Sequence, residues 1–519
     1  MRLLGLSLLF LGALAATGQV MDIAFPTARW FFNVSREVPG LQLHGFLWFG
    51  WLSTAIFVLS GLAMIVRSYA SGPRNPITTR RIRRFCEIKR GYYSLVLLIL
   101  LGGLASLDQV VVGKRALAVK YEDKWSFPAF LPSDLKNKDF GVRDKTAEAP
   151  ADYRKLKRTW DKSSGNRVIM PLIPYDPTGD TLAPRSRPMT QRDGVYSESN
   201  SSKPYFGLVG RYDDVAEAKM HVRYTMRKGL LTGPADGWNA QGMPVYSAEY
   251  KDGILISDRF SGEGTKEAFL ASQSSELRAV KYHPAPPIPE EGNWLGTTSQ
   301  GYDVLAYLYG GLQVNFKAAL IYLPIVYVIG ITIGMMMGYF GGWFDLVAQR
   351  IIEVLSNMPF LFIVIILSSM VPEQFKGLPI ILTILVAFGW MGMTFLMRTA
   401  AYRDKERDYI SAARVLGAGN SRILFRHLLP NTVAIIVTVV PFTMSDLVFS
   451  LTSLDYLGFG LPPEYATWGR LLNDGLSNLS APWLVTSTFA VLVGMLILIT
   501  FIGEAVREAF DPKKFTFYR

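Results

Sequence analysis

Eight apolar runs without charged residues divide this chain, and they constrain its fold more than any other feature. Most of them reach the roughly 18–20 residues that a helix needs to cross the hydrocarbon core of a bilayer. Because lipid offers backbone groups no hydrogen-bond partner, such runs are expected to form helices. The runs are residues 3–21, 38–66, 91–107, 318–344, 354–372, 377–397, 428–445 and 475–503. The sequence therefore predicts an all-α polytopic membrane protein.

The composition excludes several classes of protein. Half of the 519 residues are hydrophobic and 18% are charged. A single cysteine, Cys86, rules out an internal disulfide, and the four histidines do not cluster, so no metal site is predicted. The chain has no phosphate-binding loop of the GxxxxGK[ST] type, no serine elbow and no zinc-binding helix motif. We therefore expect no catalytic residues and no cofactor in this chain.

The formal net charge of +12 is concentrated in loops between apolar runs. Residues 67–90 hold eight Arg and Lys residues and one Glu. Such a loop is typical of the cytoplasmic side of a membrane protein, where basic residues accumulate. A secondary role in binding anionic lipid headgroups is also compatible with this charge. Nucleic acid is not predicted as a partner, because aromatic residues are not interleaved with the basic ones and no base-reading motif is present.

A cytoplasmic 67–90 loop fixes the topology that follows it. Residues 91–112 then form the first core helix, and the segment 113–312 is external. Residues 313–503 supply five more core helices and bring a basic segment, 398–428, back to the cytoplasm. Residues 504–519 form a cytoplasmic tail. The orientation follows from residues 67–90 alone. It places the second basic segment, 398–428, in the cytoplasm as well, where the same rule expects basic residues.

The N-terminal part, residues 1–66, has two interpretations. Residues 3–16, followed by small residues, resemble a cleavable signal peptide, but the same run is long enough to be a retained helix. If it is retained, it forms a hairpin with the run at 38–66, which then leads into the cytoplasmic loop. If it is cleaved, the second run enters from outside.

The external segment 113–312 differs in composition from the rest of the chain. It is rich in charged residues, Pro, Gly and Ser, and aromatic and polar residues alternate at 120–130 and 254–260. This pattern predicts short strands and turns, hence a mixed α/β or β-rich module with its own small core. Within it, the turn-rich stretch 177–204 is predicted to be a mobile linker.

The basic segment 398–428 lies between two apolar runs and carries a specific pattern. Its helix-prone residues are interrupted at Gly417, which predicts two short helices separated by a turn. Leu416 and the alanines Ala412 and Ala413 are predicted to form a small flat apolar surface. A surface of this kind in a cytoplasmic loop suits docking against another protein.

Several segments resemble one known family. They read DYISAARVLGA and RHLLPN (408–418 and 426–431), NWLGTTSQGYDVLAYLYGG (293–311), GYFGGWFD (338–345), RIIEVLSNMP (350–359), SLDYLGFGLPPEYATWGRLL (453–472) and GEAVREAFDP (503–512). Together they resemble the C-type permease subunit of dipeptide and oligopeptide ABC importers. The KYEDKWSFP stretch is similar to microcin C-type peptide uptake permeases. Thr298 and Tyr302 depart from the family, which usually has Asp and Arg there. The resemblance leaves residues 1–66 and most of the external insert unexplained.

The resemblance implies a six-helix type I importer core and a set of partners. The expected partners are a second, B-type permease, two ATP-binding subunits or one fused ATPase, a solute-binding protein, the transported peptide and membrane lipid, all at the bacterial inner membrane. The residues implied in coupling to the ATPase are Asp408, Ser411, Ala412, Ala413, Leu416, Gly417, His427 and Pro430.

One further residue bears on the mechanism. Asp446 follows an uncharged run, and it is either hydrated near the outer mouth of the membrane or a pathway-lining acid that meets the amino terminus of a peptide. An alternative function is an ion-coupled secondary transporter of peptides, which would need inverted repeats and several buried ionisable residues. The sequence offers one such residue and no repeat. A membrane-anchored receptor would explain the external module but not the 398–428 segment.

Overall fold

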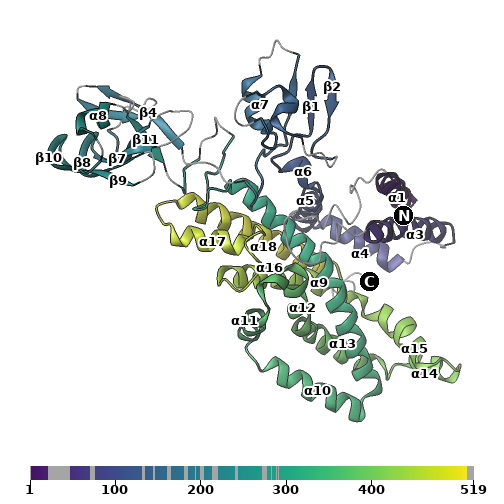
Figure 1. Cartoon of the computed structure of the whole chain (residues 1–519). Helices are drawn as coiled ribbons and strands as arrows, with labels where there is room; N and C mark the ends of the chain where they lie inside the picture. The colour runs from purple at the N-terminus through teal and green to yellow at the C-terminus, as the bar shows by residue number, and fades with distance from the viewer. Residues whose placement is uncertain are drawn as a thin grey trace. The chain divides into compact units, whose positions relative to one another are not determined.

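The computed structural model describes residues 2–20, 47–70, 76–130, 135–143, 147–160, 165–180, 185–192, 194–198, 204–212, 220–239, 243–262, 264–271, 277–281, 283–287, 289 and 292–510. The chain divides into two compact units. The first comprises Met1–Asp180, Pro287–Gly296 and Tyr302–Arg519, and the second comprises Thr181–Pro286 and Thr297–Gly301. Each unit has its own hydrophobic core. Figure 1 labels helices and strands of both units. The last nine residues of the predicted cytoplasmic tail, 511–519, lie outside the described residues.

The first unit is mostly helical, as predicted. In the described residues, four helical stretches are long and apolar enough to cross a membrane: Val304–Phe340, Leu378–Asp404, Asn420–Tyr456 and Pro482–Phe510. Two bent helix pairs raise the number to six if each pair is one span. The helices of this core are α5 (Lys89–Ser106), α9 (Val304–Phe340), α10 (Gly342–Ser356), α11 (Phe360–Met370), α12 (Leu378–Gly389), α13 (Met391–Asp404), α16 (Leu429–Tyr456), α17 (Trp468–Ser477) and α18 (Pro482–Phe510).

Two predicted spans differ from the observed helices. The run 354–372 is not one straight helix, because α10 ends near Pro359 and α11 starts after it with a bend of 80°. Proline lacks the backbone N–H that would continue the helix, so this break has a local cause. The predicted span 475–503 begins before the observed helix, because α17 ends at Ser477 and α18 begins only at Pro482. Proline is favourable at the start of a helix. Pro441, by contrast, lies inside the continuous helix α16.

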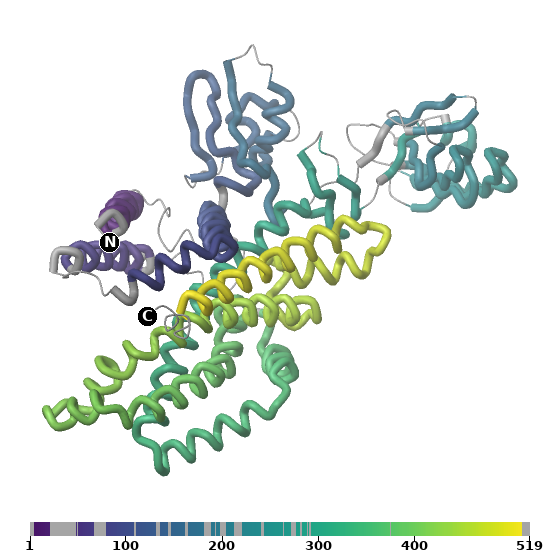
Figure 2. Tube along the Cα trace, turned by 180° about the vertical axis from the view of Figure 1, so that it is seen from behind, coloured from purple at the N-terminus to yellow at the C-terminus, as the bar shows by residue number. Residues whose placement is uncertain are grey.

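Glycines allow α9 and α13 to pack closely. A Cβ atom added to Gly334 would lie 2.4 Å from the carbonyl oxygen of Thr394, and one added to Gly338 would lie 2.4 Å from that of Arg398. The backbones therefore approach each other at the C-terminal half of α9, as both views of the trace show (Figures 1 and 2). The glycine face of this helix thus serves packing within the chain.

The N-terminal runs form two packed helices, α1 (Arg2–Val20) and α3 (Leu47–Ala70). Added Cβ atoms at Gly5 and Gly12 would lie 2.7 Å from side-chain atoms of Ile65 and Val58. The two helices therefore pack against each other closely at glycines of α1. The first residues of the predicted run 38–66 lie outside the described part. From α3, the chain reaches the basic helix α4 (Pro76–Glu87), which meets α5 at 94°.

Between α5 and α9 the chain forms two β-sheets. The first belongs to the helical unit and has the order β2-β1-β3, with β1 (Ala118–Tyr121), β2 (Lys124–Ser126) and β3 (Arg167–Ile169) beside η2 (Asn137–Phe140) and α7 (Tyr153–Thr159). Its hairpin turn uses Glu122 and Asp123 at positive φ values of 46° and 61°, as a two-residue turn requires. Phe140 and Tyr153 pack edge to face in its core, with ring centroids 5.8 Å apart.

The second unit is an antiparallel sheet. Its described strands have the order β10-β9-β8-β7-β6-β11-β4-β5. Their bounds are β4 (Arg185–Arg192), β5 (Val195–Glu198), β6 (Gly207–Tyr212), β7 (Met220–Arg227), β8 (Leu230–Trp238), β9 (Pro244–Lys251), β10 (Ile254–Phe260) and β11 (Arg278–Lys281). The prediction of a linker at 177–204 is wrong for β4 and β5, because β4 pairs with β11, a strand that is distant in the sequence.

Candidate functional site

The turn after α14 (Asp408–Val415) carries the most exposed large aliphatic side chains of the 398–431 segment. Val415 is 88% exposed and Leu416 is 85% exposed. Gly417 follows with a φ of +77°, and a Cβ atom there would contact nothing within 4 Å. The break predicted at this glycine is confirmed: α15 (Asn420–Arg422) begins three residues later and continues as a π-helix (Ile423–Leu428).

The two alanines of the predicted apolar surface point in different directions. Ala412 is exposed, whereas Ala413 is 7% exposed and lies in α14 beside the buried Ile410. Residues four apart share a helix face, so Ala412 lies on the same side as Leu416, while Ala413 is rotated away from it. The prediction that both alanines flank Leu416 on one surface is therefore wrong. The observed surface consists of Ser411, Ala412, Val415 and Leu416, which we call the α14 tip.

Tyr339, near the C-terminal end of α9, contacts the chain on both sides of the turn, at Arg414 before it and at Asn420 after it. Its hydroxyl group donates a hydrogen bond of 3.1 Å to Asn420 Oδ1. The guanidinium of Arg414 lies 5.2 Å from the centre of the Tyr339 ring, within the range of a cation–π contact. Behind the tip, Ile423 and Leu424 are buried in the main hydrophobic core. The turn is thus attached to α9 by polar contacts and to the core by apolar ones.

Ion pairs fix the helix that leads into α14. Asp345 is 3% exposed and receives two hydrogen bonds from Arg398, at 2.5 and 2.6 Å, and one from the Tyr402 hydroxyl at 2.9 Å. Asp404, equally buried, lies 3.0 Å from Arg403 Nε and 3.1 Å from Arg407 Nε. These carboxylates are compensated by positive partners, which a buried charge requires. The α13–α14 connection is therefore held in one geometry.

The other predicted coupling residues are spread over three elements. Asp408 and Ser411 are exposed on α14, together with the tip. His427 is partly buried in the π-helix, and its carbonyl oxygen accepts a hydrogen bond of 3.1 Å from Asn431 Nδ2. Pro430 stands in the first turn of α16. The structure therefore places Asp408, Ser411, Ala412, Leu416 and Gly417 on α14 and the turn after it, while His427 and Pro430 belong to the π-helix and to α16.

Asp446 lies inside α16 and is exposed, away from the 408–417 turn in the sequence. One turn earlier on the same helix, Thr443 forms a hydrogen bond of 3.0 Å with the Tyr327 hydroxyl of α9. Among the residues that the structure describes, no three His, Cys, Asp or Glu side chains are grouped as metal ligands.

Sequence reasoning missed three contributors to this site. Val415 was not singled out, although it is as apolar and exposed as Leu416. Tyr339 and Asp345 were missed because their partners are distant in the sequence. Both residues lie in the family-like block 338–345, and this resemblance was the only feature of the sequence that could have pointed to them.

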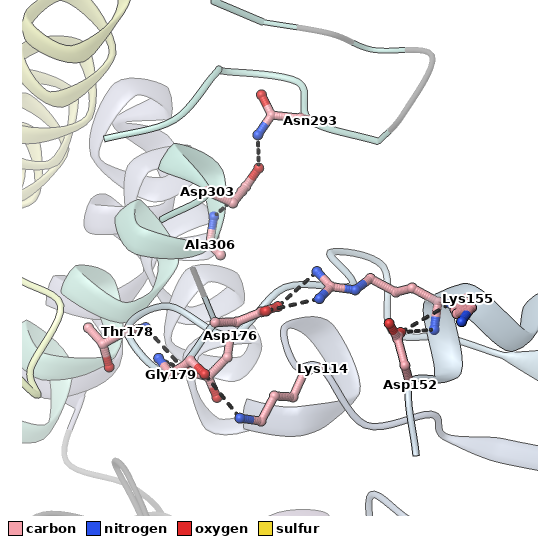
Figure 3. Close-up of polar contacts among 11 residues, drawn as sticks. Lys114, Asp152, Lys155, Asp176, Thr178, Gly179, Asn293, Asp303 and Ala306 are labelled. Carbon is pink, nitrogen blue, oxygen red and sulfur yellow. Dashed lines mark hydrogen bonds and ion pairs between the residues drawn. The ribbon is translucent and has the colours of Figure 1, made fainter. Parts of the chain in front are cut away.

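The opposite end of α9 is a closed polar network. Asp303 caps this helix by accepting a 2.8 Å hydrogen bond from the Ala306 amide, and it receives a 2.7 Å bond from Asn293 Nδ2 (Figure 3). The Trp468 indole N–H donates to the Leu308 carbonyl at 2.9 Å. Arg470 donates to the carbonyl groups of Leu461, Pro462 and Tyr465. The family-like block 453–472 is thereby fastened to the start of α9.

Comparisons with known proteins agree on one family. A family model described as binding-protein-dependent transport system inner membrane component matches residues 330–516. The chain is 44% identical over 440 residues to the inner membrane ABC transporter permease protein YejE of Escherichia coli, covering 85% of this chain and 98% of the relative. It is 43% identical over 222 residues to the peptidoglycan transport system permease protein YejE of Agrobacterium fabrum, covering 43% of this chain and 58% of the relative.

A more distant relative and one solved structure extend the comparison. The dipeptide transport system permease protein DppC of Bacillus subtilis is 32% identical over 248 residues, covering 47% of this chain and 76% of the relative. A chain of the MetNI methionine ABC transporter in an inward-facing conformation matches 40% of this chain and 96% of its own length, with a TM-score of 0.33 and 17% identity. That structural likeness is too distant to add to the sequence comparisons.

Proposed function

Because the chain belongs to the family of permease subunits of peptide ABC importers, we propose that it forms a peptide pathway together with a second permease and is driven by separate ATPase subunits. In this proposal a solute-binding protein delivers the peptide to the external face. Two ATP-binding subunits, or one fused ATPase, act from the cytoplasm. The chain itself carries out no chemistry.

The α14 tip is the observation that carries this proposal. Val415 and Leu416 are exposed at the turn of a segment that also contains Arg403, Arg407 and Arg414. A basic, polar segment belongs in water rather than in lipid. Large aliphatic side chains exposed to water at such a turn mark a surface that another protein covers. A short helix that inserts its apolar side chains into a groove of a partner is a recurrent mode of recognition.

The contacts of Tyr339 supply a route from the tip to the membrane helices. When ATP binding moves the groove that holds the tip, Arg414 and Asn420 transmit the displacement to the end of α9. The close packing of α9 on α13 and the Asp345–Arg398 pair, which joins α10 to α13, make these three helices move together. A rigid-body rotation of packed helices of this kind is a common form of switching. We propose that it opens the pathway alternately to either side.

The proposed orientation places residues 67–90 and 398–428 in the cytoplasm and residues 113–312 outside. The two N-terminal helices are retained in the inner membrane as a hairpin, and the β-rich insert docks the solute-binding protein or covers the outer mouth. Single cysteines in a Cys86→Ser background test this topology with a thiol reagent that does not cross membranes. Position 205 should be labelled in intact spheroplasts and position 411 only after membrane disruption; the reverse result contradicts the orientation.

Reconstitution tests the function itself. The chain, its second permease and the ATPase are placed in liposomes with the solute-binding protein, and ATP hydrolysis and peptide uptake are measured together. We expect peptide-loaded binding protein to stimulate hydrolysis and uptake only when this chain is present. Uptake driven by an ion gradient without ATP would instead establish the alternative secondary transporter.

A further inference from the structure

A cleft of about 440 Å³ lies in the first unit, beside the three-stranded sheet. Its walls come from three places: the segment before β1, the loop before η2 and the loop before α7. This volume is in the range of pockets that enclose small organic ligands. The residues used below are Arg115, Leu135, Lys136, Glu148, Asp152 and Tyr153, which line it.

The walls of this cleft are fixed by backbone hydrogen bonds. The Asn137 amide donates to the Ala149 carbonyl at 3.0 Å, and the Ala151 amide donates to the Leu135 carbonyl at 3.0 Å. The Asn137 side chain accepts from the Asp152 amide, also at 3.0 Å. The two loops are thus joined along the cleft. A ligand would meet preformed walls, which lowers the ordering cost of binding.

Most positive groups around the cleft are already paired. Lys136 contacts Glu148 at 2.8 Å, and Arg154 forms an ion pair with Asp180 at 2.8 Å. Lys114 donates to the Gly179 carbonyl at 3.0 Å (Figure 3). Each of these groups has a structural partner, so none of them needs a ligand.

Arg115 differs from these groups. Its Nη1 atom is buried and has no hydrogen-bond partner in the described structure, although the residue lines the cleft. A buried donor without a partner costs on the order of 1–3 kcal/mol. The planar guanidinium also matches a carboxylate, which can accept two parallel hydrogen bonds from it.

We propose that this cleft binds a short zwitterionic peptide, with its carboxylate at Arg115. The opposite charge of the ligand has its own partner in Asp152, which also lines the cleft. Asp152 Oδ1 accepts from the amides of Arg154 and Lys155, and the second carboxylate oxygen is left to accept from an ammonium group, whereas both oxygens of Glu148 are held by Lys136 and Lys138. Leu135 and Tyr153 supply apolar contacts for the residues between the two charges. A simple inorganic anion would meet the Asp152 carboxylate unfavourably and use none of the apolar wall. The mixed lining therefore selects a molecule with both charges.

The choice of a peptide rests on the proposed function, which makes peptides the solutes that reach this unit. The cleft would then hold the peptide between its release from the solute-binding protein and its entrance into the pathway. Its role is capture at the external face, separate from the coupling of ATP hydrolysis at the α14 tip.

Binding measurements on the full chain in complex with its permease and ATPase partners, without the solute-binding protein, test the proposal. Trialanine, trialanine amide, N-acetyl-trialanine and inorganic phosphate are titrated by calorimetry. The variants are Arg115→Gln, Arg115→Lys and the control Arg158→Gln, an exposed arginine of α7 outside the cleft lining. We expect Arg115→Gln to weaken trialanine binding at least tenfold, Arg115→Lys to weaken it less, and Arg158→Gln to leave it unchanged.

The ligand series gives an independent readout that does not depend on the folding of a variant. Trialanine amide, which lacks the carboxylate, should bind the unchanged protein at least tenfold more weakly than trialanine. Equal binding of acid and amide, or displacement of trialanine by phosphate at equal concentration, would overturn the assignment. If Arg115→Gln leaves binding unchanged while peptide-stimulated ATP hydrolysis persists, the cleft proposal fails and the transport proposal stands. If hydrolysis never responds to peptide, the transport proposal fails instead.

Discussion

The two ends of α9 are built in opposite ways. At its N-terminal end, buried polar groups close a network in which Asp303, Trp468 and Arg470 all have partners. At its C-terminal end, Tyr339 supports a turn whose two largest side chains, Val415 and Leu416, touch little of the chain. At the first end, these three side chains find their partners within this chain. The second leaves apolar surface uncovered, and that difference is why we propose it as the surface for a partner.

The N-terminal end of α9, the closed end, is also packed so tightly that several of its glycines have no room for a side chain. A Cβ atom on Gly311 would lie 2.3 Å from Trp468 Cδ1, and one on Gly469 would lie 2.1 Å from the carbonyl oxygen of Thr452. A Cβ atom on Gly460 would lie 2.0 Å from Asp455 Oδ1. Because packed interiors tolerate little overpacking, the closed end acts as a fixed platform. In the proposed mechanism, motion imposed on the open end pivots the helices against this platform.

The largest effect is expected at the closed end. Gly469→Val places a branched side chain against a backbone carbonyl and should destabilise the fold by about 3 kcal/mol or more. The amount of folded protein in membranes and its thermal unfolding in detergent measure this effect. Gly494→Val is the matched control, because a Cβ atom there would meet nothing within 4 Å. Equal stability of the two variants would show that the closed end is looser than described.

The second prediction separates the two alanines of α14. Ala413→Asp buries a charge beside Ile410 and should lower the stability of the loop by a few kcal/mol. Ala412→Asp stands on the exposed face and should leave folding unchanged while it weakens ATPase binding. Thermal unfolding and co-purification with the ATPase, measured on both variants, distinguish these effects. If both variants unfolded alike, the two alanines would share one environment and the orientation of α14 would be wrong.

A smaller effect is expected for the turn at the open end. Gly417 has a φ of +77° with open space around its Cα, so Gly417→Ala introduces strain but no clash. The left-handed conformation costs a residue other than glycine about 1–2 kcal/mol. Peptide-stimulated ATP hydrolysis should fall severalfold at most, and Gly417→Asn should retain more activity than Gly417→Ala. An activity loss as complete as that caused by a charge in the interface would assign Gly417 a direct contact instead.

The smallest effect concerns an exposed ion pair in the insert. Hydrogen bonds from Lys136 and Lys138 lower the pKa of Glu148 to about 2, from the ordinary 4.5. A folded-state pKa below the unfolded one gives stability that is present above about pH 4.5 and lost as the pH falls toward 2. Glu148→Gln should therefore lower the unfolding temperature slightly at pH 6 and not at all near pH 2. If Glu148→Gln lowered the unfolding temperature by the same amount at pH 6 and at pH 2, Glu148 would contribute through packing rather than through its charge.

Sequence patterns predicted the helical core well because a bilayer demands long apolar helices. The runs at 91–107 and 377–397 coincide with α5 and with α12 and α13, and most of the run at 318–344 lies in α9, although its last residues pass the break at Gly341 and belong to α10. Local signals also indicated the strands at 118–126 and 254–260. The failure at 177–204 has a physical reason: β4 becomes a strand through its pairing with β11, and a pairing over such a separation leaves no local pattern.

The candidate site shows the same limit. The turn at Gly417 was predictable because a glycine that interrupts a helical pattern predicts a left-handed residue. The inward orientation of Ala413 depends on packing that brings the helix before Gly417 against the one after it, which spacing alone does not reveal. The closed network at the start of α9 joins residues more than a hundred positions apart. The sequence revealed the family-like blocks that form this network, but not the contacts between them.

The central claim is that the open end of α9 is the surface for the ATPase. Its most direct test compares Leu416→Asp with Leu479→Asp, a leucine that is 75% exposed between α17 and α18. Association with the ATPase is measured by co-purification of the assembled complex, with peptide-stimulated ATP hydrolysis on the same samples. The account predicts that Leu416→Asp reduces association at least about 100-fold, since a charge buried in an interface without a partner costs roughly 3–5 kcal/mol, while Leu479→Asp leaves association unchanged. Normal association and hydrolysis in a folded Leu416→Asp complex would contradict it.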